Sequence, residues 1–327
     1  MESIEARVRR LCSEAGLSFS GLSPLAGDVG QRRYFRGRAG SGTVIAALYP
    51  EGQEEAGRRW ARVRDALSPS VRVPMLLAAE PGGALHLIED LGDRPLSSVW
   101  SDSPGRRGER HARAAAVAAA IAAVPDPGAN PPFSADFFFT EMEKSRESFF
   151  TSFAREPLAA GERSVHDEFA RALASEIAGH PRTFVHRDFH LDNLLEVGGG
   201  IGVIDFQDAR PGPDSYDLAS LTGERAALVS PDPAAAAAAV EAFASAARPR
   251  EGFEGRLRRV ALQRGWKAAG TFAKVCSEGR GGVYGRFLAP QIAAVLRNLG
   301  KTGVEAEFAA ILARRSAKLF RQEESPC

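Results

Sequence analysis

Three side chains in the middle of the chain have the types and the spacing that phosphoryl-transfer chemistry needs. Asp188 is followed five residues later by Asn193, and Asp205 comes after a further twelve residues. Phosphoryl transfer requires an acceptor for the proton of a hydroxyl group and ions that neutralise the phosphate charge. Mg²⁺ takes oxygen ligands and keeps several waters, so one carboxylate and one amide suffice beside the phosphates. We therefore interpret Asp188 as the base and Asn193 and Asp205 as Mg²⁺ ligands.

The residues around this trio form a recognisable pattern. Residues 186–193 read His-Arg-Asp-x-x-x-x-Asn, and residues 204–206 read Ile-Asp-Phe. Kinases that use a Mg-bound nucleotide carry segments of this kind. Asp and Asn are also common turn residues, so each one alone would be read as part of a loop. The combined spacing, with a tight hairpin between the two metal ligands, favours the functional interpretation, whereas His186 is more typical of a residue that braces such a loop.

The elements that must position these residues change in character along the chain. Helices are predicted over the first sixteen residues and over residues 54–67, and strands over residues 22–25, 33–38, 43–49, 71–79 and 84–91. Beyond about Gly92 the apolar residues recur mainly at helical spacing. Helices are predicted at residues 109–124, 134–153, 161–178 and through most of 214–319, and a hairpin at residues 194–197 and 201–204.

A β-rich segment followed by a helical one, without βαβ alternation, argues against a Rossmann sheet. We expect an α+β, bilobal fold of the protein-kinase kind. The small β-rich N-terminal lobe, residues 1–92, would bind the nucleotide. The large helical C-terminal lobe, residues 93–327, would carry catalysis and acceptor binding.

The composition excludes several other classes of protein. The 327 residues carry a net charge of +1, and 25% of them are charged, with both signs interspersed. This balance gives no reason to expect nucleic acid or an anionic membrane as a partner. The three cysteines lack C-x-x-C spacing, and the first residues lack the apolar core of a signal peptide. We expect a cytoplasmic protein with a nucleotide and a small acceptor as partners; the oligomeric state stays open.

The loop departs from that of protein kinases. His190 stands where those enzymes have Lys or Arg, and Gln207 stands where D-F-G has glycine. His-x-Asp-x-His-x-x-Asn with Ile-Asp-Phe-x-Asp-Ala resembles the aminoglycoside phosphotransferase and choline kinase superfamily of small-molecule kinases. Further stretches are similar to the anomeric kinases that phosphorylate N-acetylmuramate and N-acetylglucosamine in cell-wall recycling: residues 32–36, 89–92, 204–209, 212–213 and 216–218, and Gln263-Arg264 with Lys267, Gly270 and Phe272.

The resemblance implies an ATP-dependent kinase that uses Mg²⁺, with Asp188 as base and Asn193 and Asp205 as metal ligands. It also implies that residues 88–91 face the adenine and that residues 27–33 cover the phosphates. The nucleotide-binding residues implied in these two segments are Gly30, Glu89, Asp90 and Leu91.

One feature of the family pattern is missing. Kinases hold the nucleotide phosphates with a strand lysine that pairs with a helix glutamate, but the first lysine of this chain is Lys144. Our hypothesis is that Arg33 or Arg36 replaces it, held by Glu54 or Glu55, because a guanidinium suits phosphate. The alternative is that these are ordinary surface charges.

For the acceptor, Asp208 is a candidate to hydrogen-bond sugar hydroxyls. Arg264 and Lys267 share a helix face with Thr271 and Lys274, and this face could meet an acceptor carboxylate or simply be solvated. We expect transfer to the anomeric hydroxyl of an amino sugar. The alternatives are an aminoglycoside, choline or homoserine-type kinase, or a nucleotide-binding pseudokinase; the basic face disfavours cationic acceptors.

Overall fold

The computed structural model describes residues 2–25, 32–98, 104–282 and 284–320. Its contacts group the chain into two compact units. The first comprises Met1–Asp102, Val124–Asn130 and Leu191–Arg210, and the second comprises Ser103–Ala123, Pro131–His190 and Pro211–Cys327. The sequence predicted one boundary at residue 92, whereas the contacts extend the first unit to Asp102 and assign two later segments to it.

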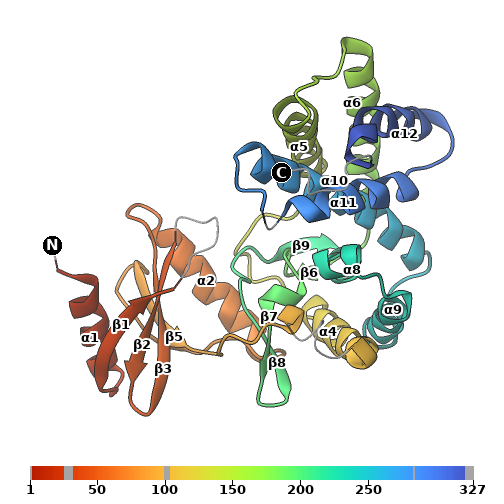
Figure 1. Cartoon of the computed structure of the whole chain (residues 1–327). Helices are drawn as coiled ribbons and strands as arrows, with labels where there is room; N and C mark the ends of the chain where they lie inside the picture. The colour runs from red at the N-terminus through yellow and green to blue at the C-terminus, as the bar shows by residue number, and fades with distance from the viewer. Residues whose placement is uncertain (1, 26–31, 99–103, 283, 321–327) are drawn as a thin grey trace. The chain divides into compact units, whose positions relative to one another are not determined.

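The first unit is built on a five-stranded antiparallel sheet in the order β1-β2-β3-β5-β4. Its strands are β1 (Phe19–Pro24), β2 (Arg33–Ala39), β3 (Gly42–Leu48), β4 (Leu76–Ala79) and β5 (Leu85–Glu89). Side chains alternate between the two faces of a strand, and Phe35, Val44 and Leu87 lie on one face. That face forms a core with Val8 and Leu11 of helix α1 (Ile4–Glu14), which lies against the sheet in Figure 1.

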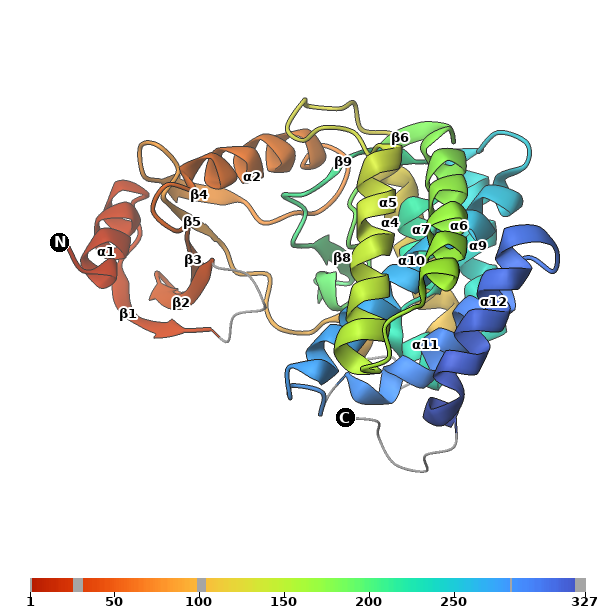
Figure 2. The ribbon, with the colours of Figure 1, turned by 90° about the horizontal axis from the view of Figure 1, so that it is seen from above.

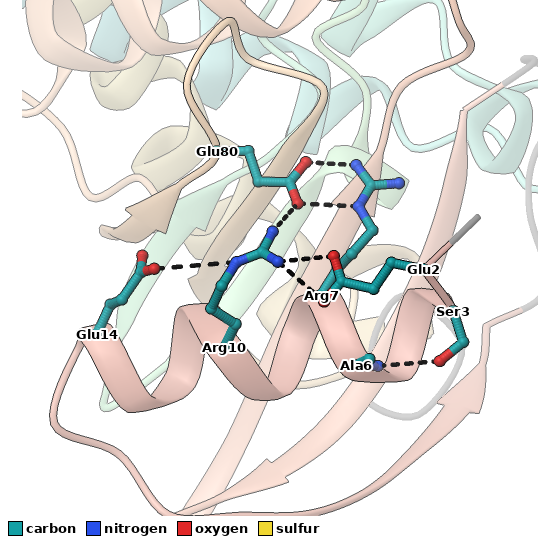
Figure 3. Close-up of polar contacts among 7 residues, drawn as sticks. All are labelled: Glu2, Ser3, Ala6, Arg7, Arg10, Glu14 and Glu80. Atoms are coloured by element: carbon teal, nitrogen blue, oxygen red, sulfur yellow. Dashed lines mark hydrogen bonds and ion pairs between the residues drawn. The ribbon is translucent and has the colours of Figure 1, made fainter.

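Helix α1 is also tied to the turn that follows β4 (Figure 3). Ser3 caps its first turn by accepting a hydrogen bond from the backbone of Ala6 at 3.2 Å. Arg7 and Arg10 both donate to Glu80 at 2.9 Å. The hydrogen bond from Arg7 lowers the pKa of Glu80. The N-terminal helix is therefore held by apolar packing and by the ion pairs of Arg7 and Arg10 with Glu80.

Helix α2 (Glu54–Leu67) has the predicted bounds and packs on the other face of the sheet (Figure 2). The centroid of its Trp60 ring lies 5.3 Å from the ring centroid of His86 in β5 and 5.3 Å from that of Phe206. A Cβ atom at Gly57 would lie 2.1 Å from the carbonyl oxygen of Gly83. Only glycine therefore permits the close approach of α2 to the turn before β5.

A hairpin far along the chain completes the first unit. It consists of β7 (Leu194–Val197) and β8 (Gly200–Val203), joined through two glycines with positive φ. The backbone N–H of Val203 donates to the carbonyl of Arg72 at 2.8 Å, and that of Glu196 donates to the carbonyl of Arg94 at 2.9 Å. These bonds explain why a hairpin near residue 200 is grouped with the N-terminal sheet.

The second unit is helical apart from β6 (Arg182–Val185), which pairs with β9 (Arg210–Pro213). Its helices are α4 (Arg107–Ala122), α5 (Ala135–Arg146), α6 (Ala160–Ala178), α7 (Tyr216–Thr222), α8 (Arg225–Val229), α9 (Pro233–Ala247), α10 (Phe253–Ser277), α11 (Gly285–Asn298) and α12 (Gly303–Ser316). Trp266 of α10 is fully buried at the centre of the core, against Phe149 and Phe308. Helices α5, α6 and α12 lie side by side in Figure 2.

Short helical segments occur at Pro104–Arg106, Leu191–Asn193 and Ala317–Phe320. The helix predicted over residues 134–153 is divided: α5 ends at Arg146, and Glu147–Phe153 forms a π-helix. Among the described residues, no helix is long and apolar enough to cross a bilayer.

Candidate active site

The predicted base lies on a loop that leaves the end of β6 with strained backbone. Arg187 has a φ of +83°, a conformation that non-glycine residues rarely adopt and that clusters at functional sites. The backbone N–H groups of His186 and Arg187 donate to the carboxylate of Asp217 at 2.6 and 3.0 Å. The His186 ring is fully buried against Phe189. A buried carboxylate and a buried ring therefore fix the backbone that presents Asp188.

The Asp188 carboxylate faces cations of α10. Lys267 Nζ lies 3.9 Å from Asp188 Oδ1. Arg264 donates to the carbonyl of Arg187 at 2.9 Å, and its guanidinium lies 4.5 Å from the ring centroid of Tyr216. Burial would raise the pKa of Asp188, but the charges of Lys267 and Arg264 lower it to about 2. Asp188 is therefore ionised at neutral pH and can accept a hydrogen bond from a hydroxyl group.

Lys267 is held between two carboxylates. Its Nζ lies 3.4 Å from Glu141 Oε1, and Gln263 donates to the other oxygen of Glu141 at 3.1 Å. Burial opposes the charged form of Lys267, yet nearby Tyr216, Glu141 and Asp188 raise its pKa overall. Lys267 therefore stays cationic beside the base.

The basic helix face that the sequence predicted is divided by the fold. Arg264 and Lys267 are partly buried and adjoin Asp188, whereas Thr271 and Lys274 are exposed. Only the first two can contribute to the site around the base.

The two predicted metal ligands stand at opposite ends of the β7–β8 hairpin, which brings their backbones together. The N–H of Ile204 donates to the carbonyl of Asn193 at 3.0 Å, and Leu194 pairs with Val203. Asp205 follows with a φ of +61°, a second strained non-glycine residue. Asn193 and Asp205 belong to the first unit, and Asp188 belongs to the second.

The carboxylate of Asp205 is held by two donors, and its role as a metal ligand stays a prediction. Gln207 Nε2 donates to Asp205 Oδ1 at 2.9 Å, and Arg32 Nη2 lies 3.3 Å from the same oxygen. An amide and a carboxylate are suitable ligands for Mg²⁺. Among the described residues there is no group of three or more His, Cys, Asp or Glu that could hold a metal ion. A metal ion at Asn193 and Asp205 would therefore need further oxygens from a substrate.

The loop after Asp205 is anchored by residues that the sequence analysis did not single out. Asn130 Nδ2 donates to the carbonyls of Gln207 and Ala209 at 2.9 and 2.8 Å. Arg59 of α2 donates to Asn130 Oδ1 at 3.2 Å. Nothing in the sequence marks Asn130, because it lies in a proline-rich loop far from Asp205 along the chain.

The structure contradicts the predicted pairing of Arg33 or Arg36 with Glu54 or Glu55. Arg36 bonds Asp90 and Asp93, both at 3.1 Å. Arg33 is exposed, with its guanidinium 5.1 Å from the ring centroid of Phe35 on the α1 face of the sheet. Among the residues that the structure describes, the two glutamates have other partners. Glu55 binds Arg58 and Arg62, and Glu54 accepts a hydrogen bond from the backbone N–H of Gly52.

In the segment predicted to face the adenine, both acidic side chains bind other residues of the first unit. Asp90, with a side chain 4% exposed, is bonded by Arg36, and Glu89 binds Arg72 and accepts from the backbone of Met75 at 3.2 Å. A Cβ at Gly202 would lie 2.8 Å from Leu91, so Leu91 packs closely on β8. A nucleotide contact by this segment stays a prediction, and Gly30 lies outside the described residues.

Asp208, the predicted acceptor ligand, lies in the first unit, where Arg210 Nη2 is 3.7 Å from its carboxylate. It lines a hollow of about 200 Å³ together with Arg32, Gln53, Ala56, Arg59 and Gln207. The predicted acceptor ligands are therefore divided, with Asp208 in one unit and Arg264 and Lys267 in the other.

The sequence of this chain is similar to the sequences of known proteins. Residues 21–253 match the model of a family described as the phosphotransferase enzyme family. An N-acetylmuramate/N-acetylglucosamine kinase of Pseudomonas aeruginosa is 29% identical over 265 residues, which cover 78% of this chain and 77% of that protein. A protein of the same name from Neisseria meningitidis is 26% identical over 202 residues, 61% of this chain and 60% of the relative. The second match thus spans less than two thirds of the relative.

The fold is shared with solved small-molecule kinases. A choline/ethanolamine kinase family protein from Mesorhizobium loti superposes with a TM-score of 0.61 at 17% identity, covering 95% of this chain and 98% of that chain. This similarity confirms the predicted α+β, protein-kinase-like fold. Because the family model covers well over half of the sequence, the chain belongs to the phosphotransferase enzyme family.

Proposed function

We propose that this chain is an ATP-dependent kinase that transfers the γ-phosphoryl group to a hydroxyl group of a small molecule. The supporting observation is Asp188, held ionised beside Lys267 at the end of a strained loop. Asp188 orients the acceptor hydroxyl and takes its proton, and Lys267 neutralises negative charge near the base. Asn193 and Asp205 would hold Mg²⁺, which neutralises phosphate charge when bound. Since ATP is the donor, we place the reaction in the cytoplasm.

We propose an amino sugar as the acceptor, with its anomeric hydroxyl as the reacting group. Two curated relatives carry the name N-acetylmuramate/N-acetylglucosamine kinase. Arg264 and Lys267 offset the negative charges of Asp188 and Glu141, so the surroundings of the base have no surplus of negative charge that would favour choline or an aminoglycoside. Arg264 and Lys267 are our candidates to attract an acceptor carboxylate such as that of N-acetylmuramate.

A pseudokinase that binds nucleotide without turnover is the second candidate, and the missing N-terminal lysine is the observation that favours it. An assay of ATP consumption over a panel of acceptors separates the two. The panel contains N-acetylmuramate, N-acetylglucosamine, simple hexoses, choline, homoserine and kanamycin. We expect turnover with the first two, and a rate about 10²- to 10⁴-fold lower in Asp188→Asn. Nucleotide binding without turnover on any acceptor would favour the pseudokinase.

A further inference from the structure

The first unit must neutralise nucleotide phosphates without a lysine. Its segments, Met1–Asp102, Val124–Asn130 and Leu191–Arg210, contain none. Only arginine can then supply a permanent cation from a side chain, since its guanidinium stays protonated at any physiological pH. The question is which arginine faces the metal ligands and has bonding capacity left.

Arg32 meets the first requirement. It lies 3.3 Å from Asp205 through Nη2. Arg32 precedes β2 by one residue. Because side chains alternate along a strand, Arg32 is on the same face of the sheet as Tyr34, and Arg33 and Phe35 are on the opposite face. Its guanidinium lies 5.9 Å from the ring centroid of Tyr34. Burial raises the pKa of the Tyr34 phenol, and the hydrogen-bonding guanidinium of Arg32 opposes this rise.

Arg32 also meets the second requirement. Its side chain is only 22% exposed, and Nη1 is buried without a hydrogen-bond partner among the described residues. A buried donor left unbonded costs about 1–3 kcal/mol, so a ligand oxygen at this position would relieve the cost. The other arginines near the site are engaged: Arg36 binds Asp90, and Arg59 binds Asn130.

The surroundings of Arg32 provide space and a second unbonded polar atom. Arg32 lines the hollow of about 200 Å³ at the start of α2. Gln207, which lines the same hollow, is 8% exposed and has an Oε1 atom that is buried without a partner, while its Nε2 holds Asp205. A partly buried cation and a buried amide thus line one cavity, and both contact Asp205.

We propose that Arg32 binds the nucleotide phosphates in the place of the lysine that this unit lacks, with the Arg32–Gln207 hollow as their site. The inference rests on the proposed kinase function. In the structure Arg32 is the counter-ion of Asp205. A divalent cation on Asp205 would take over that role and release the guanidinium, which can then bond phosphate oxygens through two N–H groups.

The test is nucleotide binding by calorimetry without any acceptor. Arg32→Met should weaken binding of the Mg²⁺ complex of a non-hydrolysable ATP analogue about 10- to 100-fold, the usual range for a lost charge-assisted contact. Binding of adenosine, which has no phosphate, should not change. Arg32→Lys should recover part of the affinity, since it restores the charge without the planar fork. Arg38→Met changes an exposed arginine of the adjoining strand β2; it is the matched control and should bind like the wild type.

The possible outcomes distinguish a failure of the proposed kinase function from a failure of the proposed role of Arg32. Wild-type protein that does not bind the Mg²⁺ analogue would contradict the kinase function itself. Wild-type binding with an unaffected Arg32→Met variant would overturn only the role of Arg32. An equal loss of adenosine affinity would also overturn it, because it would show general damage to the unit. If Arg32→Met does not fold, Arg32→Gln, which keeps a polar head, carries the same comparison.

Discussion

The ammonium group of Lys267 lies 3.9 Å from the carboxylate of Asp188 and 3.4 Å from that of Glu141. One cation therefore serves two anions, and one of the anions is the proposed base. A carboxylate with a pKa of about 2 is a weak base, so its contribution is to orient the hydroxyl and to receive the proton late. Such a role suits phosphoryl transfer through a loose transition state, in which strong activation of the nucleophile matters less than positioning.

Replacing Asp188 with Asn tests that role directly. The amide keeps the size of the side chain but cannot take a proton. We expect kcat to fall by about 10²- to 10⁴-fold, the usual worth of a positioned base, with unchanged nucleotide affinity. Steady-state kinetics on the best acceptor, with calorimetry of nucleotide binding, measures both quantities. Normal turnover in Asp188→Asn would remove this residue from its assigned role.

Lys267→Met should change the pH dependence of the reaction. In the wild type the pKa of Asp188 is lowered from 3.8 to about 2. The stability that its negative charge contributes is therefore lost only as the pH falls from about 4 to about 2. No acidic limb of kcat/KM should arise from Asp188 above about pH 4. Without the ammonium group, burial raises the pKa of Asp188, and an acidic limb should appear at higher pH.

The pH–rate profiles of wild type, Lys267→Met and Lys274→Met check this prediction. Lys274 is exposed on the same helix, and its loss should leave the profile unchanged. Superimposable profiles for wild type and Lys267→Met would show that Lys267 does not set the ionisation of Asp188.

Asp205 combines ligand chemistry with backbone strain, and substitutions can separate the two. Asp205→Asn, Asp205→Ala and Asp205→Gly should all weaken Mg²⁺-nucleotide affinity. A left-handed φ of +61° costs a residue with a Cβ roughly 1 kcal/mol relative to glycine. We therefore expect the free energy of unfolding of the Gly variant to exceed that of the Ala variant by about 1 kcal/mol. Urea denaturation of both variants measures the difference, and equal stability would argue against strain at this position.

Local pattern was sufficient to predict several elements of the fold. Helix α2 and strand β7 have the predicted bounds, and the hairpin between Asn193 and Asp205 follows from its turn of three consecutive glycines. The helical spacing of Arg264 and Lys267 was also predicted. Whether that face is solvated or buried depends on what packs against α10, and spacing alone does not contain that information.

The side-chain partners were much less predictable. Strand alternation gives Arg32 and Arg36 the same parity, but Arg36 pairs with Asp90, 54 residues away along the chain, whereas Arg32 pairs with Asp205. The position of Arg32 two residues before Tyr34 was a usable signal, because strand alternation directs both side chains to the same face of the sheet. No comparable signal marked Asn130, whose contacts with Gln207 and Ala209 span more than 70 residues.

Gly270 sets the distance between α10 and α5, and therefore the support of the base. A Cβ atom at this position would lie 2.5 Å from the Cα of Ser145, and backbone cannot yield as a flexible side chain does. Gly270→Ala should therefore destabilise the protein by about 1–3 kcal/mol, the usual cost of overpacking. Gly255 lies in the same helix with nothing within 4 Å of its Cβ position, so Gly255→Ala should stabilise the chain by up to about 1 kcal/mol through helix propensity alone. Urea denaturation of the two variants tests this opposition of sign. Because Lys267 lies one turn before Gly270, we also expect Gly270→Ala to lower kcat, while a stabilised Gly270→Ala would show that α10 and α5 can move apart without cost.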